Sequence, residues 1–580
     1  MKSDKLLIVS AITCLLLVGA GACSRDDEDA TSLQAGEGLL QYIPADSPYV
    51  VAAAEPLPED VRDALVEKTR PVMEAYADMA RVAITEQAAE EDADGSVRRA
   101  SQELVAEFMR LITPEGLESA GVDRHSTAAV YGHGLWPVLR VSLSDDSLME
   151  ATLTRIEEKI GAKMPTGTVD GQAYRIAGGE DEATIIIAIV EGYLVASLVP
   201  AEPGDALLRS VLGLDLPARN IADAGVLAQL AARYGYTSYG IGFLDLVRVA
   251  DMFLDGQSGL PQALLDEAGI DASNISDVCR QETRSLAGVM PRIVTGYTGV
   301  TADRMVSNTV LELRNDIATG LATIPAPVPG LGQKGQGGLF AFGMSFNPQA
   351  ARDFYAARLD ALEADPYECE WFADLQNGVE RGRAALNQPL PPVVYSFRGF
   401  LAVVENISGM NIEAGQPPTD VDMRLLVATD NAEALVAMGA MFSPDIAALE
   451  LKPDSRPVRL PVPPVAAQVE TAWLAMSDGA LALSVGEGNE AQLPDMLAAP
   501  LPDPAPFMSV EMDAGAYYGF IADVTLQAGA GADGEEQSQE FQEAFSRTMK
   551  SLEDAIDRIL FDVHFSERGI EFPSTVELSN

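Results

Sequence analysis

Short runs of alternating apolar and polar residues, separated by turn residues, recur along the chain and predict antiparallel strands. The longest apolar stretch, residues 183–201, is long enough to span a membrane. Glu191 and Gly192, however, divide it into two runs rich in β-branched residues, as a tight turn between strands would. The second half contains a comparable stretch, TAWLAMSDGALALSV, with Asp478 and Gly479 at its centre. We therefore expect two buried β-hairpins and no membrane span.

The sequence blocks of the first half recur in the second half in the same order. Residues 48–61, PYVVAAAEPLPEDV, match residues 338–351, GLFAFGMSFNPQAA, and each block predicts a strand that leads into a helix. Later blocks repeat a strand followed by a helix with an acidic start, and then a final antiparallel pair of strands. The correspondence aligns charged residues of the two halves: Arg140 with Arg424, Asp245 with Asp513, and Arg292 with Arg558.

This repetition predicts an α+β protein with two tandem repeats, at residues 37–322 and 337–580. Strands occur as hairpins and strand–helix pairs, so we expect each repeat to be a curved antiparallel sheet with helices packed on one face. Residues 323–336 are rich in proline and glycine, and they predict a linker that is stiff at first and then flexible.

The N-terminus has the three parts of a secretory signal. Lys2 and Lys5 accompany an apolar run at residues 6–18, and four small residues follow before Cys23. Residues 18–23, VGAGAC, resemble the lipobox of bacterial lipoproteins, and this resemblance implies lipid attachment to Cys23. The alternative is an ordinary cleaved signal in which Cys23 is incidental.

The expected products are a signal peptide, residues 1–22, and an acidic tether, residues 23–36. The run SRDDED in the tether carries like charges that repel one another, so it should stay solvated. In lipoproteins of this kind, Ser24 after the cysteine implies the outer membrane, with the protein facing the periplasm. Two or more acyl chains hold a protein firmly, so the lipidated form should be stably anchored.

The charge of the chain limits its partners. The sequence has 87 acidic and 39 basic residues, for a formal net charge of −48. A field of this sign repels nucleic acid and anionic lipid head groups, so we expect no nucleic-acid partner. An acidic surface of this kind suits a protein in high salt, because salt screens the repulsion between its exposed charges. We therefore also expect a source rich in salt.

Two cysteines remain outside the signal peptide and the lipid site, namely Cys279 and Cys369. In an oxidising compartment an even pair of cysteines is a candidate disulfide. Two separate buried thiols remain the alternative, because the sequence does not give their distance. A bridge between them would link the two repeats across the linker.

One motif suggests a nucleotide, but its context does not fit. Gly330, Gly332 and Gly335 satisfy the GxGxxG pattern, yet a proline-rich linker precedes it and a strand follows. A dinucleotide site needs a strand before the motif and a helix after it. The histidines are scattered, and neither HExxH nor CxxC occurs in the sequence. We therefore expect no cofactor and no transition-metal site.

Two further patterns also have plainer interpretations. Asp123, His125 and Ser126 supply the groups of a hydrolytic triad, but a triad needs groups that converge from separate segments, so we expect a polar loop. Residues 90–95 begin like a calcium loop, but Ser101 stands where a bidentate glutamate belongs. A solvated helix break is the preferred interpretation there, with loose calcium binding as the alternative.

The charged residues that recur between the halves either line two equivalent sites or cap helices and form ion pairs within the fold. We expect the structural role, which is the commoner one. Aromatic residues, including Trp136, Trp371 and Trp473, either build a binding surface or pack in the core, and core packing is the default for aromatic residues on strands.

A resemblance supports the location without adding a site. Residues 42–49, YIPADSPY, and the stretch from Cys279 to Tyr297 are similar to segments of uncharacterised lipoproteins from Gram-negative bacteria. That group has no assigned activity, so the resemblance implies an envelope protein and transfers no catalytic, cofactor or metal residue.

The function expected from the sequence is a non-enzymatic envelope lipoprotein, attached to the membrane through its lipid anchor. It would bind a ligand, lipid or envelope protein in the groove or on the sheet surface of its two repeats. A hydrolase of envelope or extracellular substrates, acting through dispersed Asp, Ser and His residues, is one alternative. A structural or assembly component of the envelope is the other.

Overall fold

The computed structural model describes most of the chain after the N-terminal segment. The described residues are 38–90, 113–180, 183–255, 275–409, 420–461, 471–528 and 538–579, with Leu33, Glu107, Arg110, Leu111, Gln262 and Pro418. The predicted signal peptide, Cys23 and, apart from Leu33, the predicted tether lie outside the described residues. The same is true of Ser101 and of most of the calcium-loop candidate, residues 91–95.

The protein is α+β with a large antiparallel sheet, as the sequence predicts at this level. Its contacts divide it into two compact units. Unit 1 takes the chain up to Thr309 together with Gln539–Ser551, and unit 2 takes Val310–Ser538 and Leu552–Leu578. The division therefore comes before the predicted linker, and not within it.

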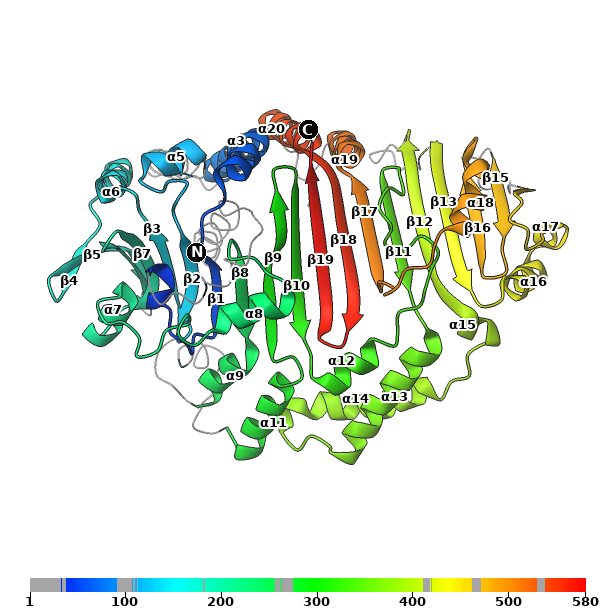
Figure 1. Cartoon of the computed structure of the whole chain (residues 1–580), viewed down its shortest axis with the longest axis horizontal. Helices are drawn as coiled ribbons and strands as arrows, with labels where there is room; N and C mark the ends of the chain where they lie inside the picture. Colours follow the sequence, from blue (N-terminus) through cyan, green and yellow to red (C-terminus); the bar gives the residue numbers. More distant parts are fainter. Residues whose placement is uncertain are drawn as a thin grey trace. The chain divides into compact units, whose positions relative to one another are not determined.

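The strands of unit 1 pair in the order β4-β5-β6-β7-β3-β2-β1-β8-β9, with β10 after β9 (Figure 1). Their bounds are β1 (Tyr49–Ala53), β2 (Ala128–His133), β3 (Trp136–Ser142), β4 (Thr166–Val169), β5 (Gln172–Glu180), β6 (Ala183–Val190), β7 (Tyr193–Pro200), β8 (Ile241–Asp245), β9 (Arg292–Thr301) and β10 (Arg304–Glu312).

The strands of unit 2 pair in the order β14-β15-β16-β13-β12-β11-β17-β18-β19. Their bounds are β11 (Phe340–Ser345), β12 (Phe397–Ser408), β13 (Asp420–Thr429), β14 (Val458–Leu460), β15 (Ala472–Met476), β16 (Ala480–Val485), β17 (Met508–Asp513), β18 (Ile556–Ser566) and β19 (Gly569–Leu578).

Both predicted hairpins are present. Strands β6 and β7 pair along their whole length around Glu191 and Gly192, whose φ angles of 50° and 78° are the positive values that a type I′ turn needs. Strands β15 and β16 pair around Asp478 and Gly479, but neither of these residues has a positive φ. The apolar stretch at 183–201 is therefore sheet, and no helix among the described residues is long and apolar enough to cross a membrane.

Helices of each unit gather beyond the ends of the strands, as Figure 1 shows for α5 and α6 at one end of unit 1 and for α9 and α11 at the other. In unit 1 they are η1 (Gly38–Tyr42), α3 (Glu59–Glu90), α5 (Pro114–Ser119), α6 (Asp146–Ile160), α7 (Asp205–Leu212), α8 (Val226–Tyr234), α9 (Leu246–Leu254), α11 (Asp277–Ala287) and most of α20 (Gln539–Ala555). In unit 2 they are α12 (Asn315–Leu321), α13 (Pro348–Ala364), η3 (Glu370–Phe372), α14 (Ala373–Leu386), α15 (Pro392–Ser396), α16 (Ala432–Phe442), α17 (Pro444–Ala447), η5 (Asn489–Gln492), α18 (Leu493–Ala498) and α19 (Ala514–Ala528).

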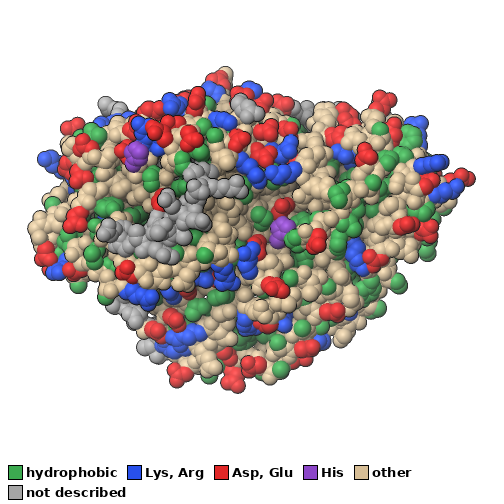
Figure 2. Space-filling model, viewed as in Figure 1, with side chains coloured by type: hydrophobic (Ala, Val, Ile, Leu, Met, Phe, Trp, Pro, Cys, Tyr) green, Lys and Arg blue, Asp and Glu red, His purple; other side chains and the backbone are tan. Residues whose placement is uncertain are grey.

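Several arginines hold two carboxylates each. Arg284 on α11 binds Asp251 and Asp255 of the α9 segment, at 2.6 and 2.5 Å. Arg383 on α14 binds Asp360 and Glu363 of α13, at 2.5 and 3.0 Å. On the face shown in Figure 2, acidic and basic side chains lie interspersed, with apolar side chains between them. Scarce cations are thus shared between pairs of acids on neighbouring elements.

The predicted linker, residues 323–336, is part of unit 2 and packs into its core. Val328 and Leu331 are fully buried against Leu401 and Leu426. Gly330, Gly332 and Gly335 adopt positive φ, so the glycines serve turns that the packed path requires. Composition predicts a connector here, but burial of its apolar side chains fixes the segment in place.

Candidate functional site

The triad candidate forms a turn. Asp123 Oδ1 accepts a hydrogen bond from His125 N at 2.9 Å, and Ser126 Oγ accepts one from Asp123 N at 3.1 Å. Ser126 Oγ lies 3.4 Å from Asp123 Oδ1. These local bonds close the loop before β2, and they engage the Asp123 carboxylate and the Ser126 hydroxyl.

The glycine loop at 330–335 is filled by a side chain of the protein itself. Glu511 on β17 is buried, and its two carboxylate oxygens accept hydrogen bonds from Gly335 N at 2.8 Å and Gln336 N at 3.1 Å. Arg558 Nε lies 3.3 Å from Glu511 Oε1. Successive backbone N–H groups of this kind attract anions. Here a carboxylate of the chain itself accepts from two of them.

The aligned charged residues have structural roles. Asp245 and Asp513 cap the helices that follow them, by accepting hydrogen bonds from Arg248 N and Ala516 N at 2.9 Å each. In the sheets, Asp245 is opposite Arg292, and Asp513 is opposite Arg558. Arg424 is bound within the fold as well, because Nε donates to Glu405 Oε1 at 2.8 Å and Nη2 donates to Gln336 O at 3.0 Å.

Arg140 on β3 differs from Arg424, because no carboxylate in the described part of the chain forms an ion pair with it. It is the largest fully buried side chain in the described part of the protein. Its guanidinium carbon lies 3.9 Å from the centre of the Tyr42 ring and 5.6 Å from that of Tyr193. Nη2 donates to Val211 O, in the last turn of α7, at 3.2 Å. The π faces and the negative end of the helix therefore stabilise the charge.

The surroundings of Arg140 are rigid and unreactive. Within the described residues, Arg140 Nε and Nη1 and Tyr131 Oη make no hydrogen bond. Burial raises the pKa of Tyr131, with Arg140 opposing the rise. Burial, together with the hydrogen bond from Tyr42 Oη to Glu191 Oε2 at 3.1 Å, raises the pKa of Tyr42 to about 12. Both phenols stay protonated at neutral pH, so this cluster joins η1, α7 and the sheet without offering a base.

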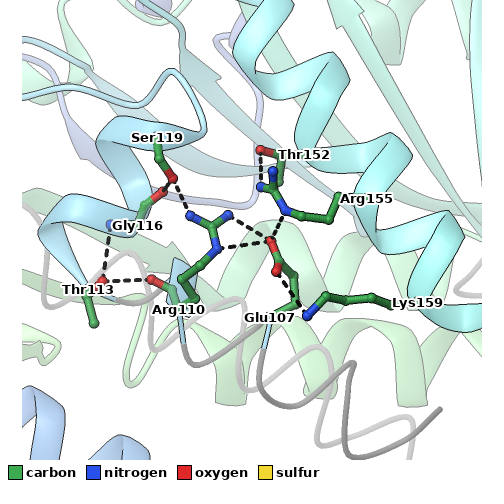
Figure 3. Close-up of polar contacts among 8 residues, drawn as sticks. All are labelled: Glu107, Arg110, Thr113, Gly116, Ser119, Thr152, Arg155 and Lys159. Carbon is green, nitrogen blue, oxygen red and sulfur yellow. Dashed lines mark hydrogen bonds and ion pairs between the residues drawn. The ribbon is translucent and has the colours of Figure 1, made fainter.

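A second polar cluster surrounds Glu107, a residue that the sequence did not single out (Figure 3). Its side chain is 3% exposed. It accepts hydrogen bonds from Arg110 at 2.7 Å and Arg155 at 2.8 Å, and Lys159 Nζ lies 3.5 Å away. Arg110 also donates to Ser119 on α5. The cluster thus joins the segment before α5 to α6 through one shared carboxylate.

The pKa of Glu107 shows how strongly this cluster is coupled. Burial alone would raise the pKa, but the hydrogen bonds and positive charges of Arg110 and Arg155 outweigh burial and lower it to about 2. Glu107 is therefore ionised throughout the range in which proteins work. A permanently ionised carboxylate that three cations hold is a structural anchor and a poor proton donor.

Cys279 and Cys369 form the predicted disulfide. Cys279 lies in the first turn of α11, and Cys369 immediately precedes η3. Both residues are buried, so the bond is protected from solvent. Among the described residues, no group of three or more His, Cys, Asp or Glu side chains has the arrangement of a metal site.

Large apolar side chains are exposed at two places in unit 2. Around α13 and α14, Tyr355, Trp371 and Leu375 are 60%, 43% and 49% exposed. At the end of α16, Met441 and Phe442 are 81% and 82% exposed. Of these residues, only Trp371 was a candidate from the sequence, and the nearly uncharged sequence of α16 was the signal for the other place.

The other aromatic residues considered from the sequence pack mainly inside. Trp136 is buried, and Trp473 packs against the core of unit 2. Tyr131, with 1% exposure, is also a core residue. Core packing, the default expectation, therefore holds for these residues and not for Trp371.

Comparisons with known proteins add little to this geometry. No family model matches the chain, and no curated protein matches it. A solved structure described as "Structure of crystal form I of TP0453" is similar at a TM-score of 0.21 and 9% identity, over 48% of this chain and 81% of that chain. At this TM-score the likeness assigns neither a fold nor a function.

Proposed function

We propose that the protein is a non-enzymatic lipoprotein of the bacterial cell envelope that binds a partner protein through unit 2. Trp371, in η3 immediately before α14, carries this proposal, because large exposed aromatic side chains are enriched at binding surfaces. Leu375 is exposed in the first turn of α14, and Tyr355 is exposed on α13. We call these three side chains the aromatic surface.

The helix pair beneath the aromatic surface is well ordered. Gly382 on α14 lies close against Leu359 on α13, since a Cβ there would meet the leucine at 3.1 Å. Arg383 bonds α14 to two acids of α13. The exposed side chains therefore sit on a fixed support, which lowers the entropy lost on binding.

The envelope location is supported by the sequence and by the disulfide. The N-terminal segment resembles a lipoprotein signal, and attachment of lipid to Cys23 would place the mature chain at the outer membrane, facing the periplasm. A buried disulfide between Cys279 and Cys369 suits an oxidising compartment. The acidic charge supports a partner that is neither nucleic acid nor an anionic head group.

We also propose that the two units descend from a duplication of one curved antiparallel sheet. The strand order β6-β7-β3-β2-β1-β8-β9 has the counterpart β15-β16-β13-β12-β11-β17-β18, which supports this proposal. The strand register agrees as well, because Asp245 lies opposite Arg292 in unit 1 and Asp513 lies opposite Arg558 in unit 2.

Metabolic labelling with a clickable palmitate tests the anchor. We expect the wild type to incorporate the label and to fractionate with the outer membrane, because the acyl chains are added at Cys23. The variant Cys23→Ala should lose the label. Labelling that survives in C23A would contradict the proposed attachment site.

Affinity capture from solubilised native envelopes tests the aromatic surface. We expect the double variant W371S/L375S to recover at least about tenfold less of the specific partner than the wild type, because central aromatic residues dominate binding energy. The matched control is Leu216→Ser, which removes an exposed leucine of unit 1. Equal recovery with W371S/L375S and the wild type would exclude this surface.

A further inference from the structure

Helices α16 and α17 form an apolar corner, at the edge of unit 2 in Figure 1. Residues 432–447, AEALVAMGAMFSPDIA, contain only two charges, Glu433 and Asp445. Met441 and Phe442 end α16, and they are the most exposed large apolar side chains among the described residues. We call this pair the apolar tip.

The apolar tip is held by an ordered turn. Ser443 N donates to Gly439 O at 3.0 Å and closes α16, while Ser443 Oγ accepts a hydrogen bond from Ile446 N at 3.5 Å and starts α17. A Cβ on Gly439 would lie 3.4 Å from Ile446, so the two helices are close. The larger apolar residues earlier in α16, Leu435, Val436 and Met438, are half-buried. The fold therefore presents the tip in a defined position.

The shape and charge of the tip indicate the chemistry that covers it. Two adjacent apolar side chains that protrude need a soft apolar medium and do not themselves form a pocket for a ligand. The nearest charges along the chain are acidic, and the whole chain carries −48, so attraction to anionic lipids is excluded. A zwitterionic bilayer satisfies both conditions, because it offers an apolar layer without repelling an acidic protein.

We propose that the apolar tip inserts Met441 and Phe442 into the boundary between head groups and acyl chains of a zwitterionic bilayer. In the cell this inference rests on the proposed anchor, because lipid on Cys23 holds the protein beside a membrane and raises the local concentration of lipid. Insertion of the tip adds a second attachment, which orients unit 2 at the membrane surface.

Flotation with vesicles tests the tip independently of the anchor. The full chain with Cys23→Ser, which cannot be acylated, is mixed with phosphatidylcholine vesicles and centrifuged through a density gradient. We expect a floated fraction that falls about tenfold or more in M441S/F442S, since each buried side chain contributes about a factor of ten or more to partitioning. The matched control, L501S, removes another exposed apolar residue of unit 2 and should float like the parent.

A second readout places the side chain in the membrane. In an F442W variant, lipids with brominated acyl chains should quench the added tryptophan emission, and vesicles that contain phosphatidylglycerol should bind less protein than phosphatidylcholine vesicles. Failure to float, equal flotation of M441S/F442S, or a preference for the anionic vesicles would overturn the proposal. Self-association that M441S/F442S abolishes would also overturn it, by identifying a second copy as the occupant. Because the protein carries no lipid, these results are separate from palmitate labelling.

Discussion

Replacing Gly213 with alanine should lower the free energy of unfolding of unit 1 by about 3 kcal/mol. Gly213 ends α7 with a φ of +81°, a conformation that costs a non-glycine residue about 1 kcal/mol or more. The new Cβ would also lie 2.7 Å from both Arg140 Nη2 and the Tyr42 ring. Overpacking a buried site typically adds 1–3 kcal/mol.

The clash is costly because Arg140 has no room to move. Its guanidinium is buried beneath Tyr42 and donates to Val211 O, so a shift would sacrifice both contacts. Denaturant unfolding followed by Trp136 fluorescence measures the loss in unit 1, with W371F and W473F substituted in every sample to remove the signal from unit 2.

The control variant is Gly161→Ala. Gly161 ends α6 with a φ of +75°, but a Cβ there meets no atom within 4 Å. It should therefore cost only the conformational part, about 1 kcal/mol. If G213A and G161A destabilise unit 1 equally, then Arg140 is not confined as described.

Replacing Glu107 with glutamine should destabilise unit 1 by about 2 kcal/mol at neutral pH. A pKa lowered from 4.5 to about 2 corresponds to about 3 kcal/mol of stabilisation, and partial exposure of Arg110 and Arg155 reduces that figure. The same Trp136 readout applies.

The difference between the wild type and E107Q should depend on pH. Because the pKa of Glu107 is lower in the folded protein, the contribution is complete above about pH 4.5 and is lost as the pH falls towards 2. Wild type and E107Q should therefore converge on acidification. Glu118→Gln, which alters an exposed glutamate of α5, is the control and should leave the unfolding free energy almost unchanged. A difference that stays constant between pH 7 and pH 3 would contradict the assigned pKa.

Local sequence signals predicted individual strands, turns and helix caps better than they predicted which segments pack together. The hairpin at Glu191 and Gly192 was recognisable because turn chemistry and β-branched runs act over a few residues. Likewise, Asp245 and Asp513 were recognisable as helix caps, since a cap needs only its own first turn. Arg292 and Arg558 lie opposite these aspartates because of the strand register, which the sequence did not predict.

The sequence alignment of Arg140 with Arg424 is offset by two residues in the structure. Leu143 N bonds Gly192 O at the first hairpin, and Thr429 N bonds Gly479 O at the second, so Arg424 lies two residues further from its hairpin than Arg140 does. A shift of two keeps a side chain on the same face of a strand. The periodicity therefore cannot reveal the shift, although it changes which partners each arginine meets.

The environment of buried groups depends on distant segments, and the sequence did not predict it. Glu511 fills a glycine loop about 175 residues away, and Glu107 binds Arg155 across 48 residues. The packing of the predicted linker was hidden for the same reason, because Val328 and Leu331 meet apolar neighbours that composition does not show. Conversely, the exposed Trp371 could not be separated from core tryptophans without coordinates.

The arginines that each hold two acids carry a consequence for purification and crystallisation. Each such trio, as at Arg284 and Arg383, has two carboxylates for one guanidinium and therefore a net negative charge, which dissolved cations screen. Dialysis into a dilute buffer weakens this screening, so the two acids within each trio repel each other more strongly. The salt concentration of the buffer therefore affects how stably these helices pack.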